Sequence, residues 1–322
     1  MAGAILVSEW IEKRFGDALR TAAPGHPLAV LRGEAVDGDV AAVEAAFFSG
    51  DLFPDGARPL ARALHQAPEL RWLHVFAAGV DHPFFQRLLA RGVRITTSSG
   101  ASAVPIAHTV LLYVLALSRD LPGWGRDQAA RRWNPRDVED LQGRTLVVLG
   151  LGPIGLEVAR LAQAFRMAVV GVRRTPRGDE PCETWPLERL DDVLPRAEWL
   201  VLALPLADET RHVLDSRRLA LLPRGARVVN VGRGALIDEA ALAEALASGQ
   251  VGGAGLDVFE VEPLPPESPL WTHPRVVVTP HASGTNPGNH LRAAESFVEN
   301  LARYARGEPL RNEAEPPAAA AG

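Results

Sequence analysis

Residues 150–155 read Gly-Leu-Gly-Pro-Ile-Gly, and their surroundings set the interpretation of the whole chain. The apolar run "RTLVVL" comes directly before them, and the helical pattern "LEVARLAQAF" follows directly after. A strand, a GxGxxG turn and a helix form the context that a dinucleotide site requires. In such a site Gly150 allows the tight turn, Gly152 lets the backbone approach a pyrophosphate, and Gly155 lets the helix pack closely on the strand. A plain turn between a strand and a helix is the alternative interpretation.

Short β-rich runs alternate with helical patterns on both sides of this turn. Before it, the strand-like runs are "AILVSEW", "LAVLRG", "RWLHVFA" and "VRITTSS". After it, they are "AVVGVRR", "WLVLALP", "RVVNVG", "GAGLDVF" and "VVVTPH". Such alternation is typical of parallel βαβ units. We therefore predict an α/β fold with two doubly wound domains.

The composition excludes several classes of function. The 322 residues carry a formal charge of -5, and the arginines are spread without a basic block, so we expect no nucleic-acid partner. The longest apolar stretch, "TVLLYVLAL", is too short to span a bilayer, so we expect no membrane partner. Cys182 is the only cysteine, which excludes an internal disulfide and a cysteine-rich zinc site; we expect no metal and a cytoplasmic location. The first residues are expected to form a strand and a helix rather than a signal peptide.

The residues at the end of "AVVGVRR", the first predicted strand after the glycine turn, bear on the choice of cofactor. An NAD site usually has an acidic residue there, which accepts hydrogen bonds from the ribose hydroxyls. This chain has Arg173 and Arg174, with Thr175 next. A guanidinium binds a 2′-phosphate in bidentate fashion, whereas a carboxylate repels it. The position therefore favours NADP, with NAD as the alternative.

Four side chains that suit acid/base and anion chemistry follow later predicted strands: Arg233 in "NVGRGALIDE", Asp257 and Glu262 in "GAGLDVFEVEPL", and His281 in "VVVTPHASG". Ligands of open α/β sheets bind outside the carboxyl ends of the strands. Reduction of a 2-oxo acid needs a proton donor and a cation for the carboxylate. Histidine suits the proton step, a carboxylate partner orients it, and arginine binds a planar carboxylate. Taken singly, each residue could equally be a cap or a surface group.

Together these segments resemble the D-isomer-specific 2-hydroxyacid dehydrogenase family. The resemblance spans roughly Leu70 to Asn300 and rests on "GLGPIG", "LPLADETRHVLD", "NVGRGALIDEAALAEAL", "GAGLDVFEVEPL" and "TPHASG". It implies that Arg233 binds the substrate carboxylate and carbonyl, that Glu262 partners His281, and that His281 is the catalytic acid/base. It also implies that "FAAGVDH" is a substrate loop whose residues Ala78, Gly79 and Val80 hold the carboxylate. The cofactor residues that it implies are Gly150, Gly152, Pro153, Ile154, Gly155, Arg173, Arg174, Thr175, Pro205 and Asp257, the last holding the nicotinamide carboxamide.

The resemblance also implies an architecture and a reaction. A Rossmann cofactor domain, residues 100–286, is expected to be inserted into a flavodoxin-like substrate domain formed by residues 1–99 and 287–322. The expected reaction is reduction of a small 2-oxo acid, with glyoxylate and hydroxypyruvate as first candidates, to the D-2-hydroxy acid. The alternatives are a phosphite dehydrogenase-like oxidoreductase, which would share the Arg-Glu-His set, and a non-catalytic nucleotide-sensing scaffold. The apolar helix predicted over Val104–Leu121 suggests a homodimer, although burial within its own subunit would explain it equally.

Overall fold

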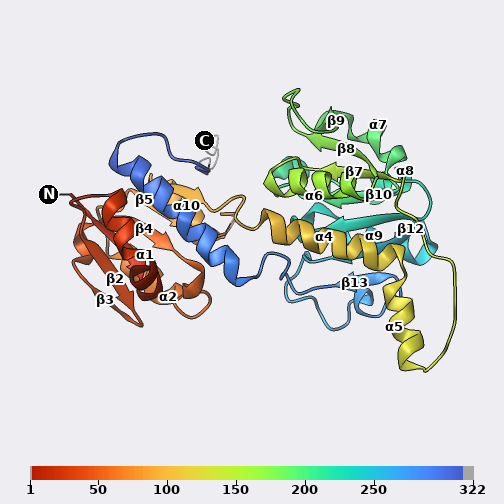
Figure 1. The fold of residues 1–322 in the computed structure, drawn as a ribbon, viewed down its shortest axis with the longest axis horizontal. Coiled ribbons are helices and arrows are strands. Elements are labelled where there is room, and N and C mark those ends of the chain that lie inside the picture. Colours follow the sequence, from red (N-terminus) through yellow and green to blue (C-terminus); the bar gives the residue numbers. More distant parts are fainter. Residues whose placement is uncertain (1, 78, 81, 315–322) are drawn as a thin grey trace. The chain divides into compact units, whose positions relative to one another are not determined.

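The computed structural model describes residues 2–77, 79–80 and 82–314 of the chain (Figure 1). The chain divides into two compact units, one formed by Met1–Ser102 with Asn286–Gly322 and the other by Ala103–Thr285. The boundaries expected from the sequence lay after residue 99 and after residue 286. The second unit is inserted into the first, so the chain passes between them twice.

In the described part of the first unit the strands form a six-stranded sheet with the order β3-β2-β1-β4-β5-β6. Neighbouring strands are parallel, except that β3 forms an antiparallel hairpin with β2. Without β3, the order is the 2-1-3-4-5 of flavodoxin-like sheets. The strands are β1 Ala4–Ser8, β2 Leu28–Arg32, β3 Ala35–Asp37, β4 Val43–Phe48, β5 Trp72–Val75 and β6 Arg94–Thr97.

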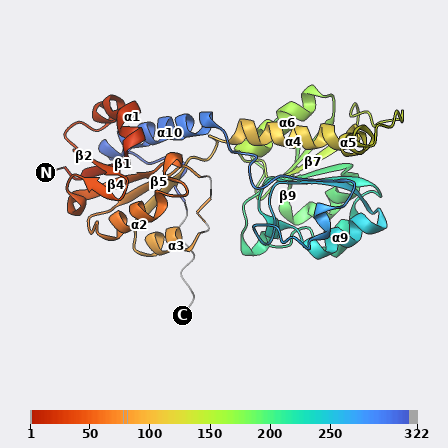
Figure 2. The same cartoon turned by 90° about the horizontal axis from the view of Figure 1, so that it is seen from below.

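Helices cover both faces of this sheet (Figure 2). Helices α1 (Glu9–Ala22) and α10 (Pro287–Ala305) pack on one face, and α2 (Ala57–His65) and α3 (Pro83–Ala90) on the other. The central strands are buried on both faces, which explains why runs such as β4, "VEAAFF", are apolar almost throughout.

The second unit contains a seven-stranded sheet with the order β13-β12-β11-β10-β7-β8-β9, and its neighbouring strands are parallel. Counted from β7, this is the Rossmann order 3-2-1-4-5-6 with one further strand. Together the two sheets confirm the predicted α/β fold class. The strands are β7 Thr145–Leu149, β8 Ala168–Arg173, β9 Glu183–Pro186, β10 Trp199–Leu202, β11 Ala226–Asn230, β12 Val251–Leu256 and β13 Val276–Val278.

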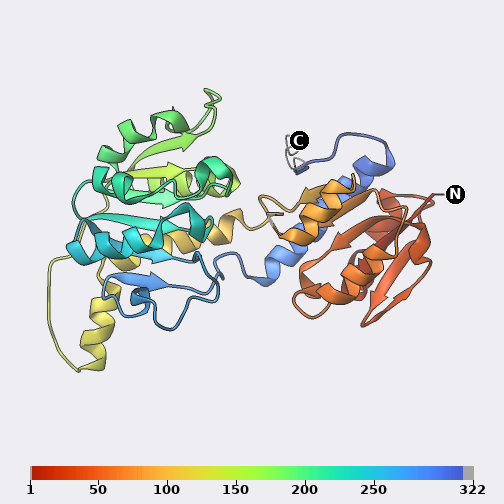
Figure 3. The ribbon, with the colours of Figure 1, turned by 180° about the vertical axis from the view of Figure 1, so that it is seen from behind.

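Helices also cover both faces of the second sheet. Helices α4 (Ala103–Ser118) and α6 (Pro153–Ala164) pack together on one face, and α8 (Ser216–Leu221) and α9 (Glu239–Ser248) cover the other, with α7 (Leu190–Val193) beside them (Figures 2 and 3). Because all the strands point the same way, their carboxyl ends lie along one edge of the sheet. The residues that follow β7, β8, β11, β12 and β13 are therefore brought to that edge.

The segment after α4 contains a further helix. The stretch from Leu121 carries prolines and glycines, and its first part, Leu121–Ala129, forms helix α5. The Asp120 side chain accepts the N–H of Gly123 at 3.1 Å, and Pro122 lies in the first turn, where its missing N–H costs no helical hydrogen bond. Within the described ranges, no single helix has the length and apolar composition to cross a membrane; only the bent pair of α4 and α5, with 63° between them, meets those criteria when taken together.

Candidate functional site

The glycine turn joins β7 to α6. Gly150 has φ 98°, a conformation that side chains disfavour, and a Cβ on Gly155 would lie 1.9 Å from the Gly150 carbonyl oxygen. Gly152 caps α6 and Pro153 is its first residue. A Cβ on Gly152 would meet no described atom within 4 Å. The turn is thus tight on the protein side and open in front of the helix N-terminus, where backbone N–H groups favour an anion.

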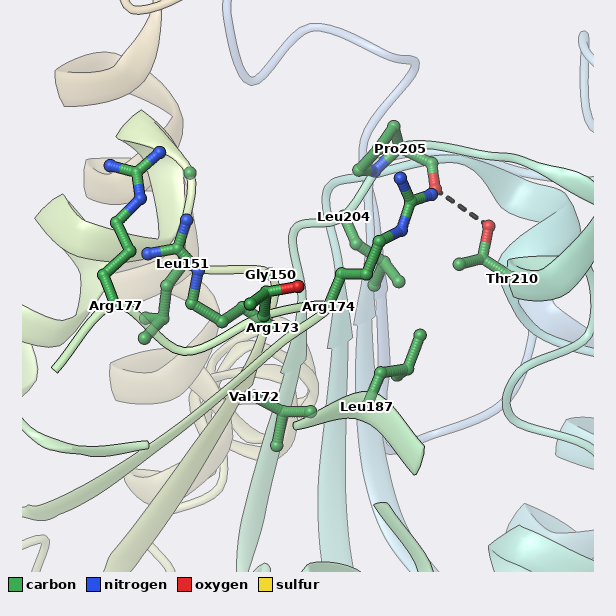
Figure 4. A pocket seen from close by; sticks show the side chains of 12 residues that line it. Gly150, Leu151, Val172, Arg173, Arg174, Arg177, Leu187, Leu204, Pro205 and Thr210 are labelled. Carbon is green, nitrogen blue, oxygen red and sulfur yellow. Dashed lines mark hydrogen bonds between the residues drawn. The ribbon is translucent and has the colours of Figure 1, made fainter. Parts of the chain in front are cut away.

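A pocket of about 510 Å³ lies over this turn, at the ends of β7, β8 and β10 (Figure 4). Its lining includes six of the predicted cofactor residues: Gly150, Gly152, Arg173, Arg174, Thr175 and Pro205. It also includes residues that sequence reasoning missed: Leu151, Val172, Arg177, Leu187, Leu204 and Thr210. Arg177 lies in the same basic stretch as Arg173 and could have been found from its charge, whereas the three leucines carry no charge and offered no comparable signal.

The three arginines of the pocket differ in their surroundings. The Arg173 guanidinium donates to Glu180 at 2.9 Å, and only 4% of the Glu180 side chain is exposed. Glu180 also accepts the N–H groups of Arg177 and Gly178, at 2.7 and 2.8 Å. These N–H groups and the Arg173 guanidinium lower the pKa of Glu180 to about 2. Arg173 is therefore held by a carboxylate that stays ionised near neutral pH.

Arg174 is the more accessible of the two predicted arginines. Its side chain is 72% exposed and pairs with Glu209 on the surface. In Figure 4 it extends toward Pro205 and Thr210, whereas Arg173 and Arg177 extend to the other side of Gly150. Guanidinium groups therefore border the pocket on two sides.

His281 and Glu262 lie together beyond the ends of β13 and β12. Nδ1 of His281 is 2.8 Å from Oε2 of Glu262, and both side chains are partly exposed. The other carboxylate oxygen of Glu262 accepts the N–H of Phe259 at 3.0 Å. This anchors the carboxylate, and the carboxylate in turn sets the ring's orientation and directs Nε2 away from itself. The structure thus brings together two of the three predicted catalytic residues in a direct contact.

Arg233 follows β11 in a turn organised by a buried asparagine. The Asn230 side chain accepts the N–H of Gly232 at 3.1 Å and donates to the Arg233 carbonyl at 2.9 Å. The half-buried Arg233 side chain donates to the Gly232 carbonyl at 2.8 Å. A Cβ on Gly234 would lie 1.8 Å from the carbonyl carbon of Phe259, so this turn touches the loop that carries Glu262. Sequence reasoning missed Asn230, although it precedes the glycines of the same motif.

Asp257 is fully buried at the end of β12. Its carboxylate accepts the Thr279 hydroxyl and the N–H groups of Ala282 and Ser283. These contacts place Asp257 beneath the turn that carries His281. The predicted contact of Asp257 with a nicotinamide carboxamide stays a prediction.

The predicted substrate loop lies between β5 and α3 in the first unit. Ala78 lies outside the described residues. The Val80 carbonyl accepts the Gln86 side chain at 2.9 Å, so the described end of the loop is attached to α3; Gly79 lies just before it. Their role toward a carboxylate is likewise still a prediction.

Comparison with known proteins identifies the family. The profile described as "D-isomer specific 2-hydroxyacid dehydrogenase, NAD binding domain" matches residues 111–283. The chain is 35% identical over 255 residues to a glyoxylate reductase of Aeropyrum pernix, covering 76% of each chain. It is 34% identical to glyoxylate/hydroxypyruvate reductase B of Serratia proteamaculans, covering 77% of this chain and 79% of that one.

Solved structures agree with these relatives over nearly the whole chain. A D-isomer specific 2-hydroxyacid dehydrogenase from Xanthobacter autotrophicus Py2, in complex with NADPH and MES, has a TM-score of 0.80 and 36% identity, with 98% of this chain and 99% of that chain covered. An NADPH-dependent glyoxylate/hydroxypyruvate reductase from Sinorhizobium meliloti, in complex with NADP and sulfate, has a TM-score of 0.79 and 27% identity at the same coverage. With the glycine turn and the His281–Glu262 pair on one Rossmann sheet, the chain belongs to the D-isomer-specific 2-hydroxyacid dehydrogenase family.

Proposed function

We propose that this protein is an NADPH-dependent reductase that converts a small 2-oxo acid, such as glyoxylate or hydroxypyruvate, to the D-2-hydroxy acid. The observation that carries the proposal is the contact between His281 and Glu262 on the same sheet edge as the glycine turn. The names of the relatives, glyoxylate reductase and glyoxylate/hydroxypyruvate reductase, support the class of substrate.

The residues of the pocket fit a dinucleotide phosphate. The helix N-terminus at Gly152 faces open space, and the N–H groups of Ile154 and Gly155 lie in the first turn of α6, where intrahelical partners are missing. We assign the pyrophosphate to this turn, and the 2′-phosphate to Arg173, Arg174 and Thr175. The cationic lining supports NADP over NAD. Pro205 and Asp257 are assigned to the cofactor by family resemblance. When bound, NADPH supplies the hydride for the carbonyl carbon.

The chain's own side chains handle the proton and the carboxylate. Glu262 holds Nδ1–H of His281, so that Nε2 carries the proton given to the carbonyl oxygen as it becomes a hydroxyl. Arg233 binds the substrate carboxylate and polarises the carbonyl, because a guanidinium matches a planar carboxylate with two parallel hydrogen bonds. Gly79 and Val80 are assigned to the carboxylate by family resemblance, together with Ala78.

We also propose a homodimer formed through α4, α5 and the segment that follows. Large apolar side chains are exposed along this surface: Val104, Leu112, Leu121, Trp124 and Trp133, the last at 97%. Exposed apolar patches of this kind mark protein contacts, and a second copy of the chain is the partner that we assign. A cytoplasmic location belongs to the same proposal, since a chain whose only cysteine is Cys182 suits a reducing compartment.

The test is a turnover assay that follows the loss of NADPH absorbance with a panel of 2-oxo acids. Turnover with glyoxylate or hydroxypyruvate that disappears in His281→Ala, while NADPH still binds, would support the proposal. Oxidation of phosphite without reduction of any 2-oxo acid would replace it with the phosphite activity. NADPH binding without any turnover would indicate a nucleotide sensor instead.

A further inference from the structure

A buried chain of hydrogen bonds runs from helix α4 to the turn that carries His281. Tyr113 of α4 and Asp257 at the end of β12 are both fully buried, and the hydroxyl of the half-buried Thr279 lies between them. The Tyr113 hydroxyl contacts Oγ1 of Thr279, and Oγ1 of Thr279 is 2.5 Å from Oδ1 of Asp257. Three side chains from three different parts of the fold thus form one polar chain, which begins at Tyr113 among apolar side chains.

The direction of these hydrogen bonds follows from the donor inventory. A carboxylate only accepts, so the single hydroxyl proton of Thr279 is directed to Asp257. The Tyr113 hydroxyl therefore donates to Thr279. Burial raises the pKa of Tyr113, which keeps the phenol protonated and able to donate. Each donor in such a chain polarises the next, so the bonds strengthen one another.

The same carboxylate holds the backbone of the His281 turn. Oδ1 of Asp257 accepts the N–H of Ala282 at 2.9 Å, and Oδ2 accepts the N–H of Ser283 at 3.0 Å. The His281 N–H is bound by the Asp257 carbonyl at 2.8 Å. His281 itself has φ 51°, a left-handed conformation that persists only where its surroundings enforce it. Asp257 supplies that enforcement.

Helix α4 packs against β12 in a way that places the Tyr113 hydroxyl next to Thr279. Gly255, in β12, leaves room for the aromatic ring: a Cβ there would lie 2.4 Å from Cγ of Tyr113. One turn earlier, the Thr109 hydroxyl reaches the Ser283 carbonyl at 3.4 Å. The helix therefore supports the turn at two points, and a larger residue at 255 would displace it.

We infer that Tyr113 and Thr279 are positioning residues: through Asp257 they hold the backbone of residues 279–283 in the conformation that keeps His281 against Glu262. The inference rests on the proposed function, in which His281 delivers the proton. Neither hydroxyl is assigned to the substrate or the cofactor. Asp257, to which they connect, is assigned to the nicotinamide carboxamide, so their loss should lower kcat and raise the NADPH Kd by a smaller factor, since the phosphate contacts of the cofactor stay in place.

Three variants and two controls test this inference in the full-length protein. Tyr113→Phe should lower kcat about three- to tenfold, the effect of one lost hydrogen bond, with a smaller rise in the NADPH Kd. Thr279→Val should lower kcat at least as much, and Thr279→Ser should restore it. The double variant Tyr113→Phe/Thr279→Val should be no worse than Thr279→Val alone, because both changes break one chain. Tyr304→Phe removes the hydroxyl of the other tyrosine in the sequence and should leave kcat unchanged.

The side-chain NMR signals of the His281 imidazole provide a readout that does not depend on turnover. They should shift in Tyr113→Phe and Thr279→Val, and stay in place in Tyr304→Phe and Thr279→Ser. Unchanged signals and unchanged kcat in the first two variants would overturn the inference while leaving the proposed function intact, provided that His281→Ala is inactive. If the wild type reduces no 2-oxo acid, the proposed function fails, and the imidazole signals alone then decide whether the chain positions His281.

Discussion

Replacing Arg174 by alanine should weaken the binding of NADPH and leave the binding of NADH nearly unchanged. The Arg174 side chain borders the pocket, is 72% exposed, and has a partly exposed surface partner in Glu209. Water therefore screens the hydrogen bond of Arg174 to a phosphate. Its free energy belongs at the low end of the range for hydrogen bonds to charged groups, about 1.5 kcal/mol, and its loss should raise the NADPH Kd about tenfold. NADH has no 2′-phosphate, so it makes no such hydrogen bond with Arg174 and its Kd should stay nearly unchanged. Titration of the fluorescence of each reduced cofactor measures both constants.

Arg173 should behave differently because Glu180 already holds it. Arg173→Ala leaves the buried Glu180 carboxylate with only its backbone donors, so both NADPH affinity and thermal stability should fall. The combined change Arg173→Asp with Arg174→Val should weaken NADPH binding by one to a few tenfold steps, each about 1.4 kcal/mol. Arg160→Ala is the matched control, since Arg160 is exposed, pairs with Glu157 and lies outside the pocket lining.

Two results would refute the assignment of the 2′-phosphate to Arg173 and Arg174. A wild-type protein that binds NADH more tightly than NADPH would show that the arginines do not select a 2′-phosphate. Equal loss of NADPH affinity in Arg174→Ala and Arg160→Ala would attribute the effect to overall charge rather than to a contact.

Further predictions concern catalysis, acid stability and assembly. His281→Ala should lower the reductive kcat about 100-fold or more at an unchanged NADPH Kd, and Arg233→Ala should chiefly raise the KM for the 2-oxo acid; steady-state kinetics measure both, and an active His281→Ala enzyme would exclude this histidine as the proton donor. Burial lowers the pKa of His74 to about 3, so between about pH 6.5 and pH 3 the unfolded chain binds a proton that the folded chain does not, and stability should fall with acidification, by about 2 kcal/mol between pH 7 and pH 5. Urea unfolding at both pH values checks this, and an equal pH dependence in a His74→Gln variant would contradict it. Light scattering should give about twice the chain mass of 34.6 kDa, and Trp133→Asp should shift the population toward monomer; a wild-type monomer would overturn the dimer.

Local sequence patterns were sufficient for the architecture. The alternation of apolar runs and helical patterns predicted two doubly wound domains, because parallel strands require a helical crossover between them. The glycine turn was predictable in the same way, since the close approach of Gly155 to the Gly150 carbonyl joins residues that are near in the chain. Residues at strand ends were also predictable as a group, because parallel strands end at one edge of a sheet.

What the sequence by itself determined was therefore the order of the elements and which polar residues reach the site edge. Family resemblance implied the pairing of His281 with Glu262, and the other contacts came only from the tertiary structure. The pairing of Arg173 with Glu180 depends on how the loop after β8 folds back. Helix α5 depends on the cap at Asp120, and the prolines and glycines of this stretch do not form a helical pattern in the sequence. The contact of Tyr113 with Thr279 joins residues 166 positions apart, and the periodicity of an apolar helix does not reveal that one of its buried side chains ends in a hydrogen bond. Secondary structure follows from short-range sterics and hydrophobic periodicity, whereas such contacts are set by the packing of elements that are distant in the chain.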